Sequence, residues 1–385
     1  MNTFKFIGQI KKFEERDDRR SNTSATFDSG WTQERVKFRV VCGNSSEIVE
    51  VTGGKYPDNA KNVVYTTVYK AGSTDQRSFE NAQIKWEDRL KQEVVDSVPH
   101  FKKYTIDLAS DKIRRQAAKE GVECSQEKYS YISSYDFVLK LRELLDCNGF
   151  GTQNYVITGE IECNYSMNKD GDWVYFKKYT PRSIYLADAE EMPIATAKYD
   201  FYYDVTNYMG EVEENGDVSV FGYTPYYDRS ARGTYYYPIT LCLKKDYEKS
   251  EPLKNLLALD GNEGDIAVVG ATVEVYNGVT REKITEEDLT PGEIRAIKSG
   301  VKTLEQIVKD NGGYINGSKV RKFYFLDTGK KEFAYPRLVE DLSIELLEKR
   351  PNTETSGKKS NTATSLSKGP VFKNIDLFDD DDLAI

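Results

Sequence analysis

The chain carries one layout twice: a strand with a glycine inside it, a polar loop, and further strands of alternating character. The first copy begins with FKFIGQIKKF at residues 4–13, and the second with YVITGEIECNYS at residues 155–166. A lone glycine inside a strand often marks a bulge or a tight bend, as the corner of a small barrel requires. Gly8 and Gly159 therefore predict two small strand-rich units.

Helical patterns separate and interrupt these units. Ser110 is a good N-cap for a helix that stops at Gly121, and Thr290 with Glu293 forms a capping box around Pro291. The expected protein is mainly β with helical insertions, in the α+β class. The expected parts are a first β domain at 1–105, a helical connector at 106–150, and a second β domain at 151–345 with a helical insert at 285–311.

The end of the sequence has a different composition. Residues 346–370 are predicted to be a flexible, low-complexity tether, because they offer little to bury. Residues 371–385 form an acidic tip with five Asp and one Lys, so this tip supplies −4 of the net charge of −9. A run of like charge stays solvated, and we expect the tail to be disordered.

Signals for catalysis and metal binding are weak. The chain has one histidine, His100, no C-x-x-C pair among its five cysteines, and no G-x-S-x-G elbow. We therefore expect a non-enzyme without catalytic residues, metal or cofactor. Asp200 and Asp204 share one strand face, which leaves a metal-dependent nuclease as a weak alternative. With no signal peptide and no long apolar run, the expected location is cytoplasmic, without membrane association.

Two strands carry cations and rings in alternation. In the strand that contains residues 35–40, Val36, Phe38 and Val40 share one face, and three cations share the other. The second strand is expected to place Trp173, Tyr175, Lys177 and Tyr179 on one face, and Val174 and Phe176 on the opposite one. Cations that follow a phosphate backbone and rings that stack on bases are what sequence-independent binding of single strands needs. The candidate nucleic-acid-binding residues are Trp31, Arg35, Lys37, Arg39, Tyr56, Tyr65, Tyr69, Trp173, Tyr175, Lys177, Lys178, Tyr179 and Arg182.

These patterns also have an ordinary structural explanation. A row of Arg and Lys on a strand is commonly a solvated sheet face, and Tyr-rich strands are often core. The strands alone therefore leave two further possibilities open: a protein-interaction scaffold or virion assembly component, and a metal-dependent nuclease or helicase accessory.

The repeated layout resembles tandem OB-folds, five-stranded barrels that bind oligonucleotides on strands 2–3. The tether and tip resemble those of bacterial and phage single-stranded DNA-binding proteins, and FKFIGQIKKFEE, RVKFRVVCGN and VEVTGG look most like the large phage-encoded members. This resemblance implies binding of single-stranded DNA, or RNA, in replication or recombination, while the oligomeric state stays open. It implies that the tip recruits replication or repair proteins, although the chain ends Leu-Ala-Ile instead of Pro-Phe. The tip residues implied are Asp379, Asp380, Asp381, Asp382, Leu383, Ala384 and Ile385.

Overall fold

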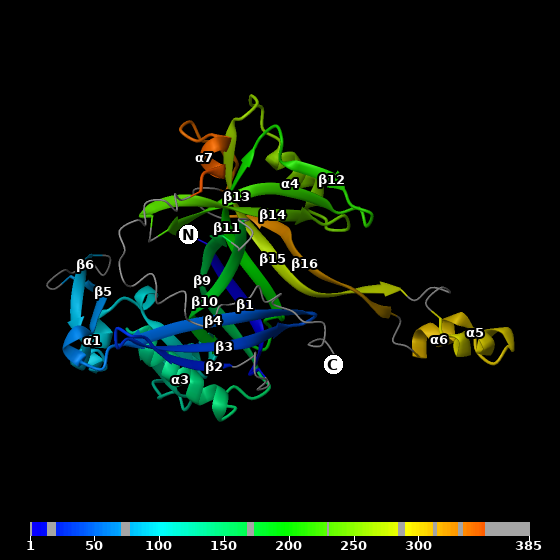
Figure 1. The fold of residues 1–385 in the computed structure, drawn as a ribbon. Coiled ribbons are helices and arrows are strands. Elements are labelled where there is room, and N and C mark those ends of the chain that lie inside the picture. Colours follow the sequence, from blue (N-terminus) through cyan, green and yellow to red (C-terminus); the bar gives the residue numbers. More distant parts are fainter. Residues whose placement is uncertain are drawn as a thin grey trace.

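The computed structural model describes residues 2–13, 21–70, 78–167, 173–228, 231–283, 289–310, 314–329 and 334–350. The expectation of a mainly β protein with helical insertions is confirmed (Figure 1). The tether is predicted at 346–370, but residues 346–348 end the helix Ile344–Glu348, in which Leu347 is fully buried, so this start of the tether is wrong. Residues 351–370 and the acidic tip lie outside the described residues.

Five strands of the N-terminal half pair in a ring, which we call the first ring. β1 pairs with β3, β3 with β4, β4 with β10, β10 with β9, and β9 with β1. The β4–β10 contact is parallel and narrow, joining Val49 to Tyr179, and the other four are antiparallel. The ring consists of β1 (Thr3–Lys11), β3 (Thr32–Cys42), β4 (Ser45–Lys55), β9 (Asn154–Met167) and β10 (Trp173–Leu186).

A second ring repeats the same order. β11 pairs with β13, β13 with β14, β14 with β16, β16 with β15, and β15 with β11. Its parallel contact again joins the third and fifth strands of the ring, through Cys242 and Tyr324. The members are β11 (Ile194–Asp204), β13 (Val218–Asp228), β14 (Gly233–Leu243), β15 (Ile266–Lys283) and β16 (Tyr314–Thr328).

Each ring has a helix between its third and fourth strands in chain order. α3 (Ser134–Asp146) lies between β4 and β9, and α4 (Ser250–Leu257) lies between β14 and β15. Gly53 lets α3 approach β4, because a Cβ at this position would lie 2.5 Å from the Tyr135 backbone. A larger residue at 53 would therefore push the helix off the strand.

β1 joins the two rings. Its first half pairs antiparallel with β11, from Thr3 opposite Lys198 to Ile7 opposite Ile194, so all the ring strands belong to one 15-stranded sheet. The assignment of residues 151–186 to the second β domain is wrong, because β9 and β10 complete the first ring. The segment expected to be a connector also supplies α3 to that ring, as well as β7 (Tyr104–Asp107) and β8 (Lys128–Tyr131) at its edge.

Gly8 and Gly159 both lie at close backbone approaches, and Gly159 pairs with Pro181 next to a register shift in β10. A Cβ on Gly8 would lie 2.2 Å from the Val41 carbonyl oxygen, and one on Gly159 would lie 2.0 Å from that of Thr180. Gly8 lies where one edge of β1 changes partner: pairing with β11 ends at Ile7 and pairing with β3 begins at Gln9, while β9 stays paired along the other edge. The glycine thus allows one strand to serve two neighbours at a corner.

The remaining elements surround the rings. β5 and β6 form a separate hairpin, followed by short helices that include the 3-10 turn η3 (His100–Lys102). The predicted caps are confirmed: Ser110 and Gly121 bound α2, and the Thr290–Glu293 capping box begins α5. These elements are β2 (Asn22–Thr26), β5 (Val63–Tyr69), β6 (Phe79–Lys85), α1 (Gln92–Ser97), α2 (Asp111–Glu120), β12 (Met209–Val212), α5 (Pro291–Lys298), α6 (Leu304–Asp310), β17 (Arg337–Leu338) and α7 (Ile344–Glu348).

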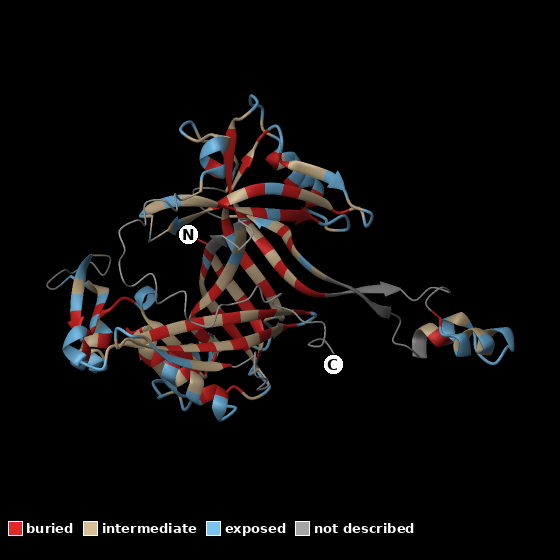
Figure 2. Cartoon of the chain, in the orientation of Figure 1, coloured by how far each residue is buried: buried red, intermediate tan, exposed pale blue. Residues whose placement is uncertain are grey.

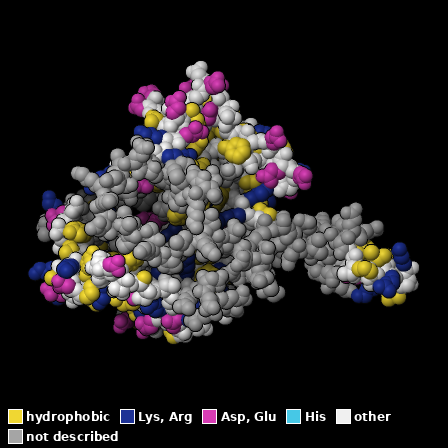
Figure 3. Space-filling model, in the orientation of Figure 1, with side chains coloured by type: hydrophobic (Ala, Val, Ile, Leu, Met, Phe, Trp, Pro, Cys, Tyr) yellow, Lys and Arg dark blue, Asp and Glu magenta, His cyan; other side chains and the backbone are white. Residues whose placement is uncertain are grey.

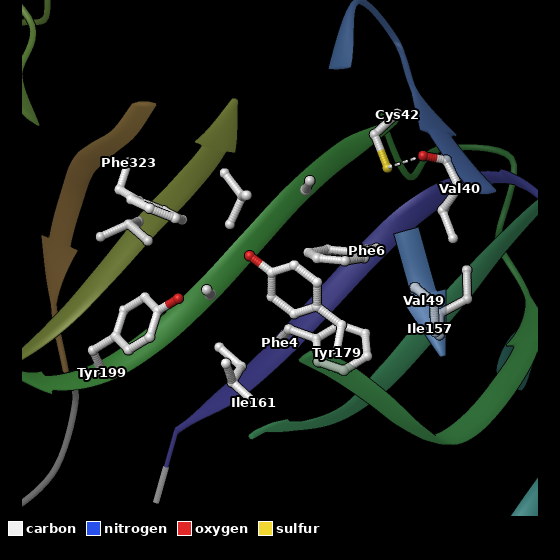
Figure 4. Close-up of a cluster of buried hydrophobic side chains, with 14 of the residues drawn as sticks. Phe4, Phe6, Val40, Cys42, Val49, Ile157, Ile161, Tyr179, Tyr199 and Phe323 are labelled. Carbon is white, nitrogen blue, oxygen red and sulfur yellow. Dashed lines mark hydrogen bonds between the residues drawn. The ribbon is translucent and has the colours of Figure 1, made fainter. Parts of the chain in front are cut away.

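Burial alternates along the ring strands (Figure 2). One continuous apolar cluster runs through both rings. Figure 4 shows part of it, where Phe4 and Phe6 from β1 face Tyr179 from β10. Among the helices of the described ranges, none is both long and apolar enough to cross a bilayer.

Candidate nucleic-acid interface

The outer side of β3, β4 and β10 carries a cluster of cations, as the alternation in β3 predicts. Val36, Phe38 and Val40 are fully buried, which turns the intervening residues outward. We call this surface the basic face. It consists of Arg35, Lys37 and Arg39 of β3, Glu50 of β4 and Lys178 of β10.

Glu50 is the central anion of the basic face. Its carboxylate lies 3.0 Å from Lys37 Nζ and 3.6 Å from Lys178 Nζ. Burial alone would raise the pKa of Glu50, but Lys37, Lys178 and Arg35 together hold it below its ordinary value. Several cations therefore share one carboxylate, and Lys178 also lies 4.0 Å from a second one, that of Glu162.

An aromatic pair lies at the end of β3 and β4. The rings of Trp31 and Tyr56 meet edge to face, with centroids 5.0 Å apart. Gly54 makes room for this pair, since a Cβ there would lie 2.5 Å from the indole. Asn62 fixes the Tyr56 backbone: the Tyr56 N–H donates to Asn62 Oδ1 (2.8 Å), and Asn62 Nδ2 donates to the Tyr56 carbonyl (2.9 Å). Both predicted rings are thus held in a half-buried position beside the basic face.

The predicted stacking face of β10 points inward. Tyr179 is only 2% exposed and packs edge-on against Phe4 (5.3 Å) and Phe6 (4.8 Å), so its assignment as a base-stacking residue is wrong. Phe176, which the alternation in the sequence places on the apolar side, is 42% exposed. Both faces of β10 carry rings, so alternation alone does not reveal which face is buried.

Tyr175 and Lys177 lie against the second ring instead of at an open surface. The Tyr175 ring meets Tyr237 edge-on at 5.4 Å, and its hydroxyl accepts a hydrogen bond from Arg350 Nε at 2.7 Å. Lys177 Nζ lies 3.6 Å from the centre of the Phe323 ring. Burial, with the charge of Arg321, lowers the pKa of this ammonium to about 7. These two residues join the rings and do not extend the basic face.

The remaining predicted residues lie elsewhere. Tyr65 and Tyr69 are on the separate β5–β6 hairpin, and Arg182 pairs with Glu160 at 2.8 Å on the side of the first ring formed by β9 and β1. Trp173 begins β10, but its side chain is outside the described part of the structure, as are Asp379 to Asp382, Leu383, Ala384 and Ile385.

The acidic side chains do not assemble into a metal-binding cluster where the structure describes them. Within the described ranges, no group of three or more His, Cys, Asp or Glu side chains is arranged to hold a metal ion. Of the two acids singled out in the sequence, Asp204 accepts hydrogen bonds from the Thr206 N–H (2.9 Å) and hydroxyl (2.8 Å). Its carboxylate therefore stabilises a turn.

No protein-family model and no curated protein matches the sequence. Two solved structures with some similarity are the wild-type single-stranded DNA binding protein from Thermus aquaticus and a deletion mutant of it, at 8% and 9% identity. The alignments cover 77% and 76% of this chain and 98% and 97% of the matched chains, with TM-scores of 0.29 and 0.27. With similarity this low, the function of the chain has to be inferred from its own geometry.

Proposed function

We propose that the chain is a non-enzymatic protein that binds single-stranded DNA, or RNA, without sequence preference. The observation that carries this proposal is the basic face with the Trp31–Tyr56 pair beside it. Cations alongside half-exposed rings fit an unpaired strand, whose phosphates and bases need these two kinds of contact. An acidic net charge does not oppose this, because exposed charges beyond about 10 Å are largely screened at 0.1 M salt.

The strand order supports a finer assignment of each ring as an OB-fold barrel. Both rings have five strands, a parallel contact between the third and fifth, and a helix between the third and fourth. In an OB-fold, strands 2 and 3 bind the oligonucleotide. In the first ring these strands are β3 and β4, which carry most of the basic face. On this assignment the two barrels span about residues 2–186 and 194–329.

The proposed biological setting is replication or recombination in a bacterial cell or a phage-infected one. The acidic tip at 371–385 would recruit partner proteins, with Leu383 and Ile385 as apolar contacts after the four Asp. This part of the proposal depends on the sequence pattern alone.

Opposite charge changes on the basic face provide the test. Lys37→Glu and Arg39→Glu should each weaken binding of a fluorescent oligo(dT) about fivefold or more at low salt, and should reduce the log–log salt slope by ~0.7 for each phosphate that is no longer bound. Glu50→Gln should tighten binding, because it removes the anion that Lys37 and Lys178 now share. Oligo(rU) in parallel distinguishes DNA from RNA preference.

Lys254→Glu is the matched control, since Lys254 is exposed on α4 of the second ring. It has the same charge change as Lys37→Glu and should leave affinity nearly unchanged. Equal losses of affinity in both variants would show that only total charge matters, and a flat wild-type titration at low salt would refute the proposed function.

One observation favours a second candidate function, an assembly component. β15 and β16 extend beyond the second ring toward α5 and α6, which stand apart from the body in Figure 1. The helices share a small apolar cluster around Leu289 and Ile307. Sedimentation of the protein without nucleic acid tests this alternative, which predicts higher oligomers that disappear when residues 284–313 are replaced by a short linker.

A further inference from the structure

Three neighbouring aromatic rings form an exposed row on the hairpin side of the molecule. Tyr69 and Phe79 face each other across β5 and β6 with ring centroids 5.6 Å apart, and Phe79 meets Phe101 of η3 edge-on at 5.4 Å. The three residues are 38%, 40% and 48% exposed. We call Tyr69, Phe79 and Phe101 the ring row. Rings held in contact with one another yet open to solvent offer surfaces to a ligand.

The ring row ends at a hollow lined with cations. Phe101 lines a cavity of about 520 Å³ that lies between η3 and the outer side of β1, β9, β10 and β11. We call this cavity the basic groove. Its cationic residues are Lys5, Lys103, Arg182 and Lys198, while Glu160 is the one carboxylate among its lining residues.

The cations of the basic groove differ in how far they are neutralised. Lys5 pairs with Glu191 at 2.9 Å and Arg182 with Glu160 at 2.8 Å, so these two are held in place. Lys198 is exposed and has no ion pair within the described ranges. Burial lowers the pKa of the Lys103 ammonium. The groove therefore keeps a positive balance, with Lys198 as its accessible charge.

The floor of the groove indicates the class of ligand. Its lining residues include the small polar side chains of Thr3 and Thr158, and that of Thr196, whose hydroxyl donates to the Lys5 carbonyl at 3.0 Å. An apolar peptide would cover the Lys198 ammonium without giving it a partner, which is costly on desolvation. A phosphate oxygen would accept a hydrogen bond from this ammonium.

We propose that the ring row and the basic groove form a second binding segment for single-stranded nucleic acid, with bases on the rings and phosphates in the groove. This segment rests on the proposed function but is separate from the basic face, because the groove lies over β9 and β1 and the face over β3 and β4. A strand that engages both segments would contact the first ring on two sides.

Photocrosslinking locates the segment directly. Oligo(dT) containing 5-iododeoxyuridine is bound to the full chain, irradiated and digested, and the modified residues are identified by mass spectrometry. We expect adducts on at least one member of the ring row in addition to Trp31 or Tyr56. Adducts confined to Trp31, Tyr56 and the basic face would overturn this inference and leave the proposed function intact.

Substitutions test the energetic contribution. Phe79→Ala and Phe101→Ala should each weaken binding of a long oligo(dT) about fivefold or more, since the stacking of one base on a ring is worth that much. Phe101→Leu keeps an apolar side chain but removes the ring, and should weaken binding similarly. Lys198→Glu should weaken binding most at low salt.

The controls are Tyr227→Ala, a ring on β13 that is 63% exposed and thus more open than the ring row, and Lys254→Glu on α4. Circular dichroism and thermal melting establish that each variant is folded. If the wild type binds and the ring-row and groove variants bind equally well, the second segment does not exist. If these variants bind more weakly while Lys37→Glu binds as well as the wild type, the second segment is supported and the role of the basic face is refuted. Absence of wild-type binding would refute both.

Discussion

At the scale of single residues, Glu47 is a carboxylate in an unusual place. It is 1% exposed on β4, with its Oε2 3.6 Å from Arg321 Nη2, and its Oε1 has no hydrogen-bond partner within the described ranges. Burial raises the pKa of Glu47 to about 7, against the opposing charges of Arg321 and Lys177. Since Arg321 belongs to β16 and Lys177 to β10, this group lies where the two rings meet.

This pKa predicts a pH dependence of stability. The folded-state pKa lies above the ordinary value of 4.5, so the contribution of protonated Glu47 is complete below 4.5 and is lost as pH rises through about 7. Glu47→Gln removes this titration. Between about pH 5 and pH 8, the free energy of unfolding of the wild type should therefore fall by roughly 1–3 kcal/mol relative to that of the variant. Urea denaturation at both pH values measures this, and parallel pH profiles would contradict it.

Residue-scale features of the site were predictable where they depend on local alternation. Arg35, Lys37 and Arg39 could be placed outward because their neighbours in β3 are all strongly apolar. The same argument fails for Tyr179, since β10 has rings on both faces. Only the packing against β1, far away in the sequence, decides which ring is buried. Of the ring row, only Tyr69 is among the residues predicted from the sequence, because Phe79 and Phe101 meet through tertiary structure.

At the scale of elements, Gly8 is the position where β1 changes partners. A Cβ there would lie 2.2 Å from the oxygen and 2.7 Å from the carbon of the Val41 carbonyl, and backbone atoms cannot move aside without separating β1 from β3. Gly8→Ala should therefore lower the free energy of unfolding by about 1–3 kcal/mol, the usual cost of overpacking. Urea denaturation measures the change.

Gly292→Ala in the first turn of α5 is the control for Gly8→Ala. The nearest atom to a Cβ at Gly292 is the Thr290 hydroxyl at 3.9 Å, so this change introduces no clash. Its effect should be small. Less backbone freedom in the unfolded chain would by itself stabilise both variants, so an equal loss of stability in the two would refute the steric explanation for Gly8.

Elements defined by short-range signals were predictable, and their partners were not. The caps of α2 and α5 depend on residues within one turn, so Ser110 and Thr290 identify them from the sequence. The pairing of β9 with β1 joins residues that are far apart in the sequence, such as Tyr155 and Gly8. Nothing in the local pattern of β9 distinguishes that partner from a strand of the second ring, and the predicted domain boundary is therefore misplaced.

At the scale of the whole molecule, the net charge is negative, while cations gather on particular surfaces of the first ring. The net charge is −9, and in Figure 3 Asp and Glu side chains are prominent over the part that carries β12, β13 and α7. Cations of the second ring also form ion pairs with carboxylates: Lys322 lies 2.6 Å from Glu213 and 3.0 Å from Asp217. The first ring is therefore where we expect most of the affinity for nucleic acid.

The acidic tip adds to this imbalance, and its removal gives the last prediction. Deleting residues 371–385 removes five Asp and one Lys and leaves a net charge of −5. The truncated chain should bind oligo(dT) more tightly at low salt, because an acidic segment competes with phosphates for cations. The difference should disappear toward 1 M salt, where the screening length is about 3 Å.

Replacing Asp379 to Asp382 with Asn at full length should reproduce the effect, whereas replacing Leu383 and Ile385 with Ser should not. Weaker binding by the truncated chain, or a lower melting temperature, would mean that the tip supports the body instead of competing for its basic face.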